Sequence, residues 1–170
     1  MGEELKEFLA SQFEHVREWT LMSCRGLSDE LLVTIPPGAK NHILWELGHI
    51  LWTESYMVTW GCAGGERLPK EWEEKFGYGS KVVATTSEYP PFDEIKKALE
   101  NRQKVTKNYI LSLSLDELMS PAANFPEEQT PSILSAFNHF LPHEAYHVGK
   151  ISLLRKMLGL PSVAELYLEK

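Results

Sequence analysis

One segment organises the chain: residues 138–150 read NHFLPHEAYHVGK and hold three of the six histidines. His139, His143 and His147 are spaced four residues apart, and side chains at i and i+4 lie on the same face of an α-helix. A neighbouring pair can therefore bring two imidazole nitrogens to one metal ion. All three cannot, because His139 and His147 are separated by about 12 Å of helical rise, whereas zinc–nitrogen bonds are roughly 2.0–2.1 Å long. The segment predicts two metal ligands here and a third on another helix, unless its histidines are buried or solvated without a metal.

The composition indicates one globular domain over residues 1–170, with 43% hydrophobic residues to form a core. The 17 basic and 24 acidic residues give a formal charge of -7, which repels phosphate backbones and predicts no nucleic-acid partner. The sequence has no signal peptide and no apolar run of about 18 residues, so we expect a cytoplasmic protein without membrane contact. Cys24 and Cys62 lack a CxxC spacing, and we expect reduced thiols packed in helices rather than a disulfide.

Four long segments have the apolar spacing of α-helices, and no segment predicts a β-strand. We expect helices over residues 3–26, 41–62, 92–113 and 130–159. Asn41 and Thr130 are the predicted N-caps of the second and fourth helices, Pro131 follows at the first helical position, and Gly159 ends the chain's last long helix.

The connection over residues 63–91 is long and is expected to contain one or two helical turns at 70–76. Antiparallel neighbours need only short loops, so a connection of this length predicts that the second and third helices run parallel. We therefore expect an all-α four-helix bundle.

The second helix is expected to supply the third metal ligand. It is apolar almost all the way round, as in a helix buried among others. Trp45, His49, Trp52 and Tyr56 follow steps of four, three and four residues and share one side. A lone histidine on an apolar face is more often a core residue than a ligand, but the helix with the histidine pair needs a partner nitrogen, which favours His49. His42, at the helix start, is expected to be exposed.

Pro142 lies inside the last predicted helix, directly before His143. A proline in a helix interior removes one backbone hydrogen bond, at a cost of about 3 kcal/mol if nothing compensates. Two interpretations stay open: a kink that re-aims His143, or the end of one helix and the start of another.

Two regions of the sequence resemble the motifs of the DinB-like (DinB/YfiT) superfamily: residues 41–54, with Leu-Gly-His at their centre, and residues 138–150. In that superfamily one histidine comes from the second helix and two come from a His-x-x-x-His, usually followed one residue further on by a glycine. Gly149 stands at that position here.

The resemblance implies that His49, His143 and His147 bind one divalent metal ion. It also implies an up-down-down-up four-helix bundle with the metal site open on one side. Arg and Gln commonly flank the glycine in the superfamily. Val148 and Lys150 stand here instead, which puts any substrate contact from these two positions in doubt.

The same resemblance implies one of two kinds of activity, although whether the protein is an enzyme stays open. Members are often assigned as metal-dependent hydrolases, and some relatives are thiol S-transferases or isomerases that use a low-molecular-weight thiol such as bacillithiol or mycothiol. Imidazole ligands favour zinc or nickel and leave iron open. Trp45, Trp52 and Tyr56 would form aromatic walls for a small organic substrate, although core packing explains them equally well. A homodimer is also left open.

Residues 143–147 also satisfy His-Glu-x-x-His, the zinc-protease pattern in which the glutamate is the general base. That interpretation is weak, because Lys150 and Leu153 stand where metzincins carry Gly and His, and no strand is predicted that could bind a peptide. Glu144 is still a candidate general base for metal-activated water. The remaining alternative is a non-catalytic bundle that binds a metal or a partner.

Overall fold

The computed structural model of the protein describes residues 2–125 and 132–169. Within these ranges it contains eight α-helices and no β-strand, which confirms the predicted all-α class. The four long helices are α1 (Gly2–Met22), α3 (Ile43–Glu54), α5 (Phe92–Ser112) and α7 (Ile133–Met157). The four short helices are α2 (Asp29–Val33), α4 (Lys70–Phe76), α6 (Leu115–Met119) and α8 (Val163–Leu168). Of these four short helices, only α4 was predicted from the sequence, with the same bounds.

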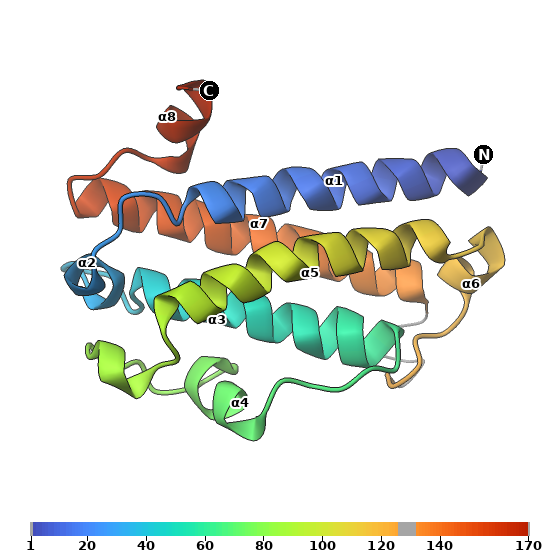
Figure 1. The fold of residues 1–170 in the computed structure, drawn as a ribbon, viewed down its shortest axis with the longest axis horizontal. Helices are drawn as coiled ribbons and strands as arrows, with labels where there is room; N and C mark the ends of the chain where they lie inside the picture. The colour runs from blue at the N-terminus through green and yellow to red at the C-terminus, as the bar shows by residue number, and fades with distance from the viewer. Residues whose placement is uncertain (1, 126–131, 170) are drawn as a thin grey trace.

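The four long helices lie side by side along the longest axis of the molecule (Figure 1). Both α1 and α3 pack on α5 and on α7, so each long helix has two long neighbours. The short helix α4 packs on α3, and α8 packs on α1 and α7. None of the described helices is both long enough and apolar enough to cross a lipid bilayer. This packing brings α3 and α7, which carry the candidate metal ligands, into direct contact.

The start of α3 differs from the prediction. His42, not Asn41, is the N-cap, and its Nδ1 accepts a hydrogen bond from the backbone N–H of Trp45 at 3.0 Å. The ring is fully buried, and its Nε2 is satisfied there by the Val83 carbonyl oxygen at 3.1 Å. The expectation of an exposed His42 was therefore wrong. An imidazole nitrogen can replace the usual Ser, Thr, Asp or Asn oxygen at an N-cap.

The second predicted helix changes its hydrogen bonding halfway along. The α-helical part, α3, continues directly into a π-helix, η1 (Ser55–Cys62). π-helical turns are rare and occur frequently at functional sites. Here the rings of Trp52, Tyr56 and Trp60 stack in a row, with successive centroids 5.6 and 5.3 Å apart. A π-helix holds more residues per turn than an α-helix, so residues four apart stay nearly in line.

The last long helix, α7, runs through Pro142 without a break. The interpretation of two separate helices is therefore wrong. Proline removes the backbone N–H that would bond the carbonyl of Asn138. Asn138 is exposed, so water can satisfy this carbonyl.

The ends of α7 are defined by a serine and a glycine. Ser132 is the N-cap, and its Oγ accepts from the backbone N–H of Ser135 at 3.1 Å. The predicted start at 130–131 lies outside the described residues. Gly159 follows the C-cap with a φ of 78°, the left-handed conformation expected of it.

A buried polar layer joins all four long helices. Arg17 of α1 donates from Nε to Glu144 of α7 at 2.7 Å and from Nη2 to Glu54 of α3 at 2.8 Å, and all three side chains are fully buried. From α5, the Leu99 carbonyl accepts from Arg17 at 3.1 Å, and the Thr106 hydroxyl donates to Glu54 at 2.5 Å. This layer links the helix pair that carries the histidines to the other two helices.

Candidate metal centre

His49 of α3 and His143 and His147 of α7 lie together at the contact between the two helices. One ligand atom of each lies within 4.8 Å of the others. The Nε2 atom of His143 is 3.2 Å from the Nε2 of His49 and 3.2 Å from the Nε2 of His147. No other group of three His, Cys, Asp or Glu residues in the described part of the chain is close enough to hold a metal ion.

Two of the three imidazoles are held at their far nitrogen. The Nδ1 of His49 is 2.6 Å from the backbone carbonyl oxygen of Phe76, at the end of α4. The Nδ1 of His147 is 2.5 Å from Oε2 of Glu46, one turn before His49 on α3. A carbonyl oxygen and a carboxylate can only accept, so both Nδ1 atoms carry a proton, and in the neutral ring the Nε2 atom is left to bind a metal. Outer partners of this kind set the tautomer and orientation of metal-binding histidines.

Glu46 is itself fixed by further contacts. Its Oε1 accepts from Lys150 Nζ at 2.6 Å and from Asn41 Nδ2 at 2.8 Å, and the carboxylate is fully buried. Burial alone would raise the pKa of Glu46, but the hydrogen bonds from His147, Lys150 and Asn41 outweigh it and lower the pKa. Glu46 is therefore ionised and can orient His147.

His49 and His143 are neutral at pH 7, as metal ligands must be. Burial lowers the pKa of His49 to about 4. Burial, followed by the nearby His147 and His49, lowers the pKa of His143 to about 3. The Nδ1 of His143 is buried and has no hydrogen-bond partner among the described residues. Three imidazoles whose nitrogens converge at short range fit a divalent cation.

Comparison with protein families agrees with this geometry. The family model of the DinB superfamily matches residues 12–151, which include all three histidines. The chain belongs to the DinB superfamily. The resemblance read from the sequence is thus confirmed. No curated protein matches the chain.

The structure does not bring Glu144, the predicted general base, to the histidine cluster. Both Glu144 oxygens are occupied, by Arg17 at 2.7 and 3.1 Å and by the Thr20 hydroxyl at 2.6 Å. Arg17 and Thr20 lie on α1, whereas His143 and His147 of α7 meet His49 on α3. A general-base role for Glu144 stays a prediction. His139 also lies outside the cluster: it is exposed, and its ring centroid is 6.3 Å from that of His143.

A cavity of about 410 Å³ lies beside the cluster and is lined by His49, His143 and His139 together with the aromatic residues Trp52 and Tyr56. The predicted aromatic wall is therefore present in part.

Trp45 does not line this cavity. Its ring stacks on His49 at 4.7 Å, and its Nε1 donates to Ser80 Oγ at 2.9 Å. Trp45 thus packs against the ring of a candidate ligand, His49, instead of forming a wall for a substrate.

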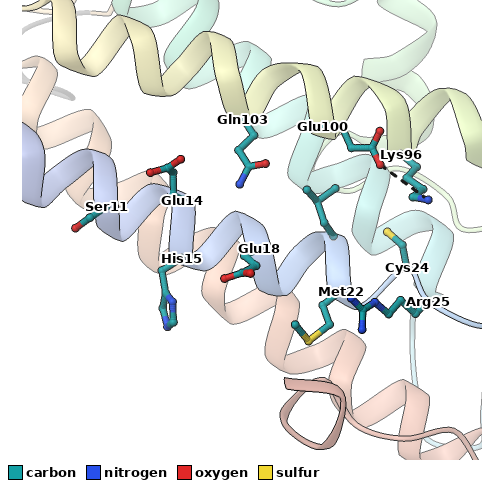
Figure 2. Close-up of a pocket in the computed structure, with 11 residues that line it drawn as sticks. Ser11, Glu14, His15, Glu18, Met22, Cys24, Arg25, Lys96, Glu100 and Gln103 are labelled. Atoms are coloured by element: carbon teal, nitrogen blue, oxygen red, sulfur yellow. Dashed lines mark ion pairs between the residues drawn. The ribbon is translucent and has the colours of Figure 1, made fainter. Parts of the chain in front are cut away.

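Figure 2 shows a larger cavity, of about 700 Å³, between α1 and α5. Two of its acidic side chains are engaged in ion pairs: Glu100 with Lys96 at 3.9 Å and Glu14 with Lys107 at 2.8 Å. Among the described residues this cavity contributes nothing to a group that could hold a metal. The histidine cluster is therefore the stronger candidate site, although its cavity is smaller.

Sequence reasoning missed Glu46 and the Phe76 carbonyl. Glu46 left a signal: it is an acidic residue inside a strongly apolar helix, three positions before His49, and a buried charge needs a partner. The Phe76 carbonyl left none. Lys150 replaces the residue common in the superfamily, and the structure shows what it does here: it pairs with Glu46.

Proposed function

We propose that the protein is a metal-dependent enzyme acting on a small molecule, with His49, His143 and His147 as ligands of one divalent ion, zinc or nickel before iron. The observation that carries this proposal is the convergence of three imidazoles, two of them aimed by hydrogen bonds at Nδ1. A divalent ion held there supplies a Lewis acid, which lowers the pKa of a water or thiol and makes it a nucleophile.

The chain's own thiols are unsuited to act as the nucleophile. Cys24 and Cys62 are free but buried, and burial raises the pKa of each thiol to about 12. A thiol transfer at this site therefore requires a low-molecular-weight thiol from solution, and a hydrolysis requires water. The cavity beside His49 and His143 gives either molecule a route to the cluster.

We also assign Glu144 a positioning role, which its contacts support. To move a proton at the histidine cluster, Glu144 would have to leave Arg17 and Thr20, which hold both of its oxygens in a buried site. Its ion pair instead fixes the rotation of α7 against α1. That rotation decides where the neighbouring His143 points.

We also propose that the four long helices form the up-down-down-up bundle that the resemblance implies. The course of the chain in Figure 1 supports this: α1 and α7 run in one direction, and α3 and α5 run in the other. A cytoplasmic location, a homodimer and the lack of a nucleic-acid partner stay predictions.

Metal analysis and a reaction screen test the proposed function together. Purified protein is expected to hold about one divalent ion per chain, with loss in His49→Ala and retention in the matched variant His139→Ala. Metal-loaded protein is then screened against electrophiles with and without low-molecular-weight thiols, beside His147→Ala.

The reaction screen separates the two chemistries. Turnover that needs the thiol and is lost in His147→Ala supports transfer, and turnover without thiol supports hydrolysis. Unchanged metal content in His49→Ala would remove α3 as a ligand donor. Metal binding without turnover would favour the competing function, a non-catalytic metal-binding bundle.

A further inference from the structure

We infer that the outer face of α7 is the contact surface of a homodimer, in which it packs antiparallel against the same face of a second copy. This contact does not depend on the proposed function, because it needs neither a metal ion nor a reaction. Three observations support it: the exposed face of α7 is apolar, a glycine at its middle has no role in the chain's own packing, and the charges of the molecule suit a contact at this face.

The outer face of α7 is apolar although it is exposed. Exposed residues that follow helical steps of four, three, four and four positions form what we call the α7 strip: Pro142, Tyr146, Gly149, Leu153 and Met157. Tyr146, Leu153 and Met157 are 63%, 62% and 44% exposed. A helix that is apolar on its outer face as well as its inner face is expected to be covered on both sides.

Gly149, at the middle of the α7 strip, is not required by the chain's own packing. Beyond its own helix backbone, a Cβ at Gly149 would meet no atom of the described chain within 4 Å, whereas a Cβ at Gly48 would collide with the ring of Phe76. Alanine at position 149 would stabilise the isolated chain, because glycine is unfavourable in a helix interior. Glycine also allows a second backbone to approach closely. Gly149 therefore marks the point at which a helix from outside the chain crosses α7.

A second copy fits the α7 strip because the strip is complementary to itself when it is reversed. A two-fold axis makes the same surface serve both partners. With this axis between positions 149 and 150, Tyr146 of one copy faces Leu153 of the other. Pro142 faces Met157 in the same way, and the two Gly149 residues meet at the centre. Large side chains thus lie on both sides of a crossing point that carries none.

The distribution of charge suits an antiparallel contact at this face. The chain carries a formal charge of -7, so two copies repel each other at most contacts. The helix α1 exposes Glu3, Glu4 and Glu7, whereas α7, all of which is described, exposes no acidic residue and one basic residue, Lys156. Lys156 is paired with Glu165 of its own chain at 3.1 Å. Antiparallel packing holds the two Lys156 residues about 20 Å apart along the helices, whereas a parallel pair would bring them together.

The short helix α8 widens the contact surface beside Gly149. A mainly apolar cavity of about 300 Å³ lies between α7 and α8 and is lined by Gly149 and Leu168, among others. Leu168 is 84% exposed. In an antiparallel two-fold pair α8 lies on the same side in both copies, so the two α8 helices lie next to each other across the axis.

The exposed apolar area is of the size that a dimer needs. At about 200 Å² for a large side chain, Leu168 and the three large side chains of the α7 strip expose about 500 Å². Each partner of a standard interface buries about 800 Å². These four side chains therefore supply more than half of that area, and the remaining residues of the strip and of α8 add to it.

Sedimentation equilibrium of the full-length protein tests the dimer. We expect the mass of a dimer at high concentration and dissociation on dilution, with chelator or with Zn²⁺ present, because the contact needs no metal. Leu153→Glu is expected to weaken self-association about tenfold or more, since it places a carboxylate between apolar side chains. Phe8→Glu, at an exposed apolar residue of α1, adds the same charge and should change nothing. A monomer at every concentration, or equal weakening by the two variants, would overturn the inference.

Disulfide cross-linking locates the axis. Gly149→Cys is expected to form a covalent dimer under mild oxidation, because two cysteines at the crossing point come within the roughly 4.4–6.8 Å between Cα atoms that a disulfide spans. The two native thiols are buried and do not compete. Ser11→Cys, at an exposed position of α1, is the control and should stay monomeric. Failure of Gly149→Cys to cross-link, or equally fast cross-linking of both variants, would contradict a contact centred on Gly149.

Mixed cross-linking determines the direction of the two helices. When Tyr146→Cys and Leu153→Cys proteins are combined, an antiparallel pair joins one variant to the other in preference to joining either to itself. Mass spectrometry of the covalent dimers measures the two products. Preferential joining of Leu153→Cys to itself would indicate a parallel pair and overturn the antiparallel contact.

Discussion

Glu46 of α3 makes three hydrogen bonds beside the histidine cluster, and one of them holds the candidate ligand His147. It accepts from His147 with one oxygen and from Lys150 and Asn41 with the other. The carboxylate is fully buried and ionised, so its negative charge strengthens the donor bond from His147. The orientation of one candidate metal ligand thus depends on a residue with no place in the predicted ligand set.

Replacing Glu46 by glutamine should weaken metal binding and leave the fold intact. Glu46→Gln keeps the size of the side chain but removes the charge, and loss of such an outer partner typically lowers metal affinity about 10- to 100-fold. Competition with a chromophoric chelator measures the effect. Glu74→Gln, at an exposed surface pair, is the control and should bind metal as the unmodified protein does. Equal affinity of the two variants would contradict the role of Glu46.

Arg17 is the only cation in contact with the carboxylates of Glu54 and Glu144 in the described polar layer. Burial alone would lower the pKa of Arg17, but these two neighbours raise it, so the guanidinium stays charged. Removing it would leave two buried carboxylates facing each other without compensation.

Arg17→Met is therefore expected to destabilise the protein by about 3–5 kcal/mol. The matched control is Lys107→Met, which breaks the partly exposed pair with Glu14 at 2.8 Å and should cost no more than about 1 kcal/mol. Urea unfolding of both variants gives the comparison. Similar losses in the two variants would show that burial adds nothing to the Arg17 network.

At the scale of elements, the contact between α3 and α4 positions His49. Gly48 lies against the Phe76 ring so closely that a Cβ on Gly48 would meet ring atoms at 2.2 Å. Phe76 is fully buried, and its carbonyl oxygen holds His49. The glycine therefore allows α4 to approach α3 closely enough for the Phe76 carbonyl oxygen to reach His49.

Gly48→Ala should displace the Phe76 ring and with it the carbonyl that holds His49. We expect a loss of about 1–3 kcal/mol in unfolding free energy, as for other overpacked cores, together with weaker metal binding. Gly149→Ala on α7 is the matched control, because its Cβ would meet nothing within 4 Å. Relief of a helix-interior glycine should stabilise that variant by up to about 1 kcal/mol. Stability is read from urea unfolding, and opposite signs for the two substitutions are the expected result.

At the scale of the whole molecule, a bound ion would join α3 to α7 across a long stretch of chain. His49 and His143 are 94 positions apart in sequence. A ligand that binds only the folded state stabilises it by about 2.7 kcal/mol at 100 times its Kd. The ion would therefore add to the stability that the apolar contacts and the Arg17 layer already provide.

Chelation should lower the thermal midpoint of the metal-loaded protein. For a chain of this size, about 2.7 kcal/mol corresponds to roughly 5–11 °C. Thermal scans with Zn²⁺ or Ni²⁺, and then with excess chelator, measure the difference. His49→Ala should show no metal-dependent shift, whereas His139→Ala should retain it. A shift that survives in His49→Ala would place the ion elsewhere.

The sequence by itself determined the features that depend on neighbours a few positions apart. The all-α class followed from helical periodicity, the bounds of α4 followed from its flanking breakers, and the His143–His147 pair followed from a spacing of four residues. His49 could be singled out because the histidine pair needed a third nitrogen from another helix, and the resemblance to the DinB-like superfamily implied the same residue. The first three are local properties, and local spacing is enough to place residues on one face of a helix.

Only the tertiary structure decided how distant residues pair. Glu46 meets His147 across 101 positions, and Glu144 turns to Arg17 across 127, away from the cluster it was expected to serve. The burial of His42 and the change to a π-helix after α3 were likewise hidden in the sequence. The physical reason is common to all of them. A buried polar group takes whichever partner the packing of the helices brings within hydrogen-bonding distance, and spacing along one helix carries no information about that packing.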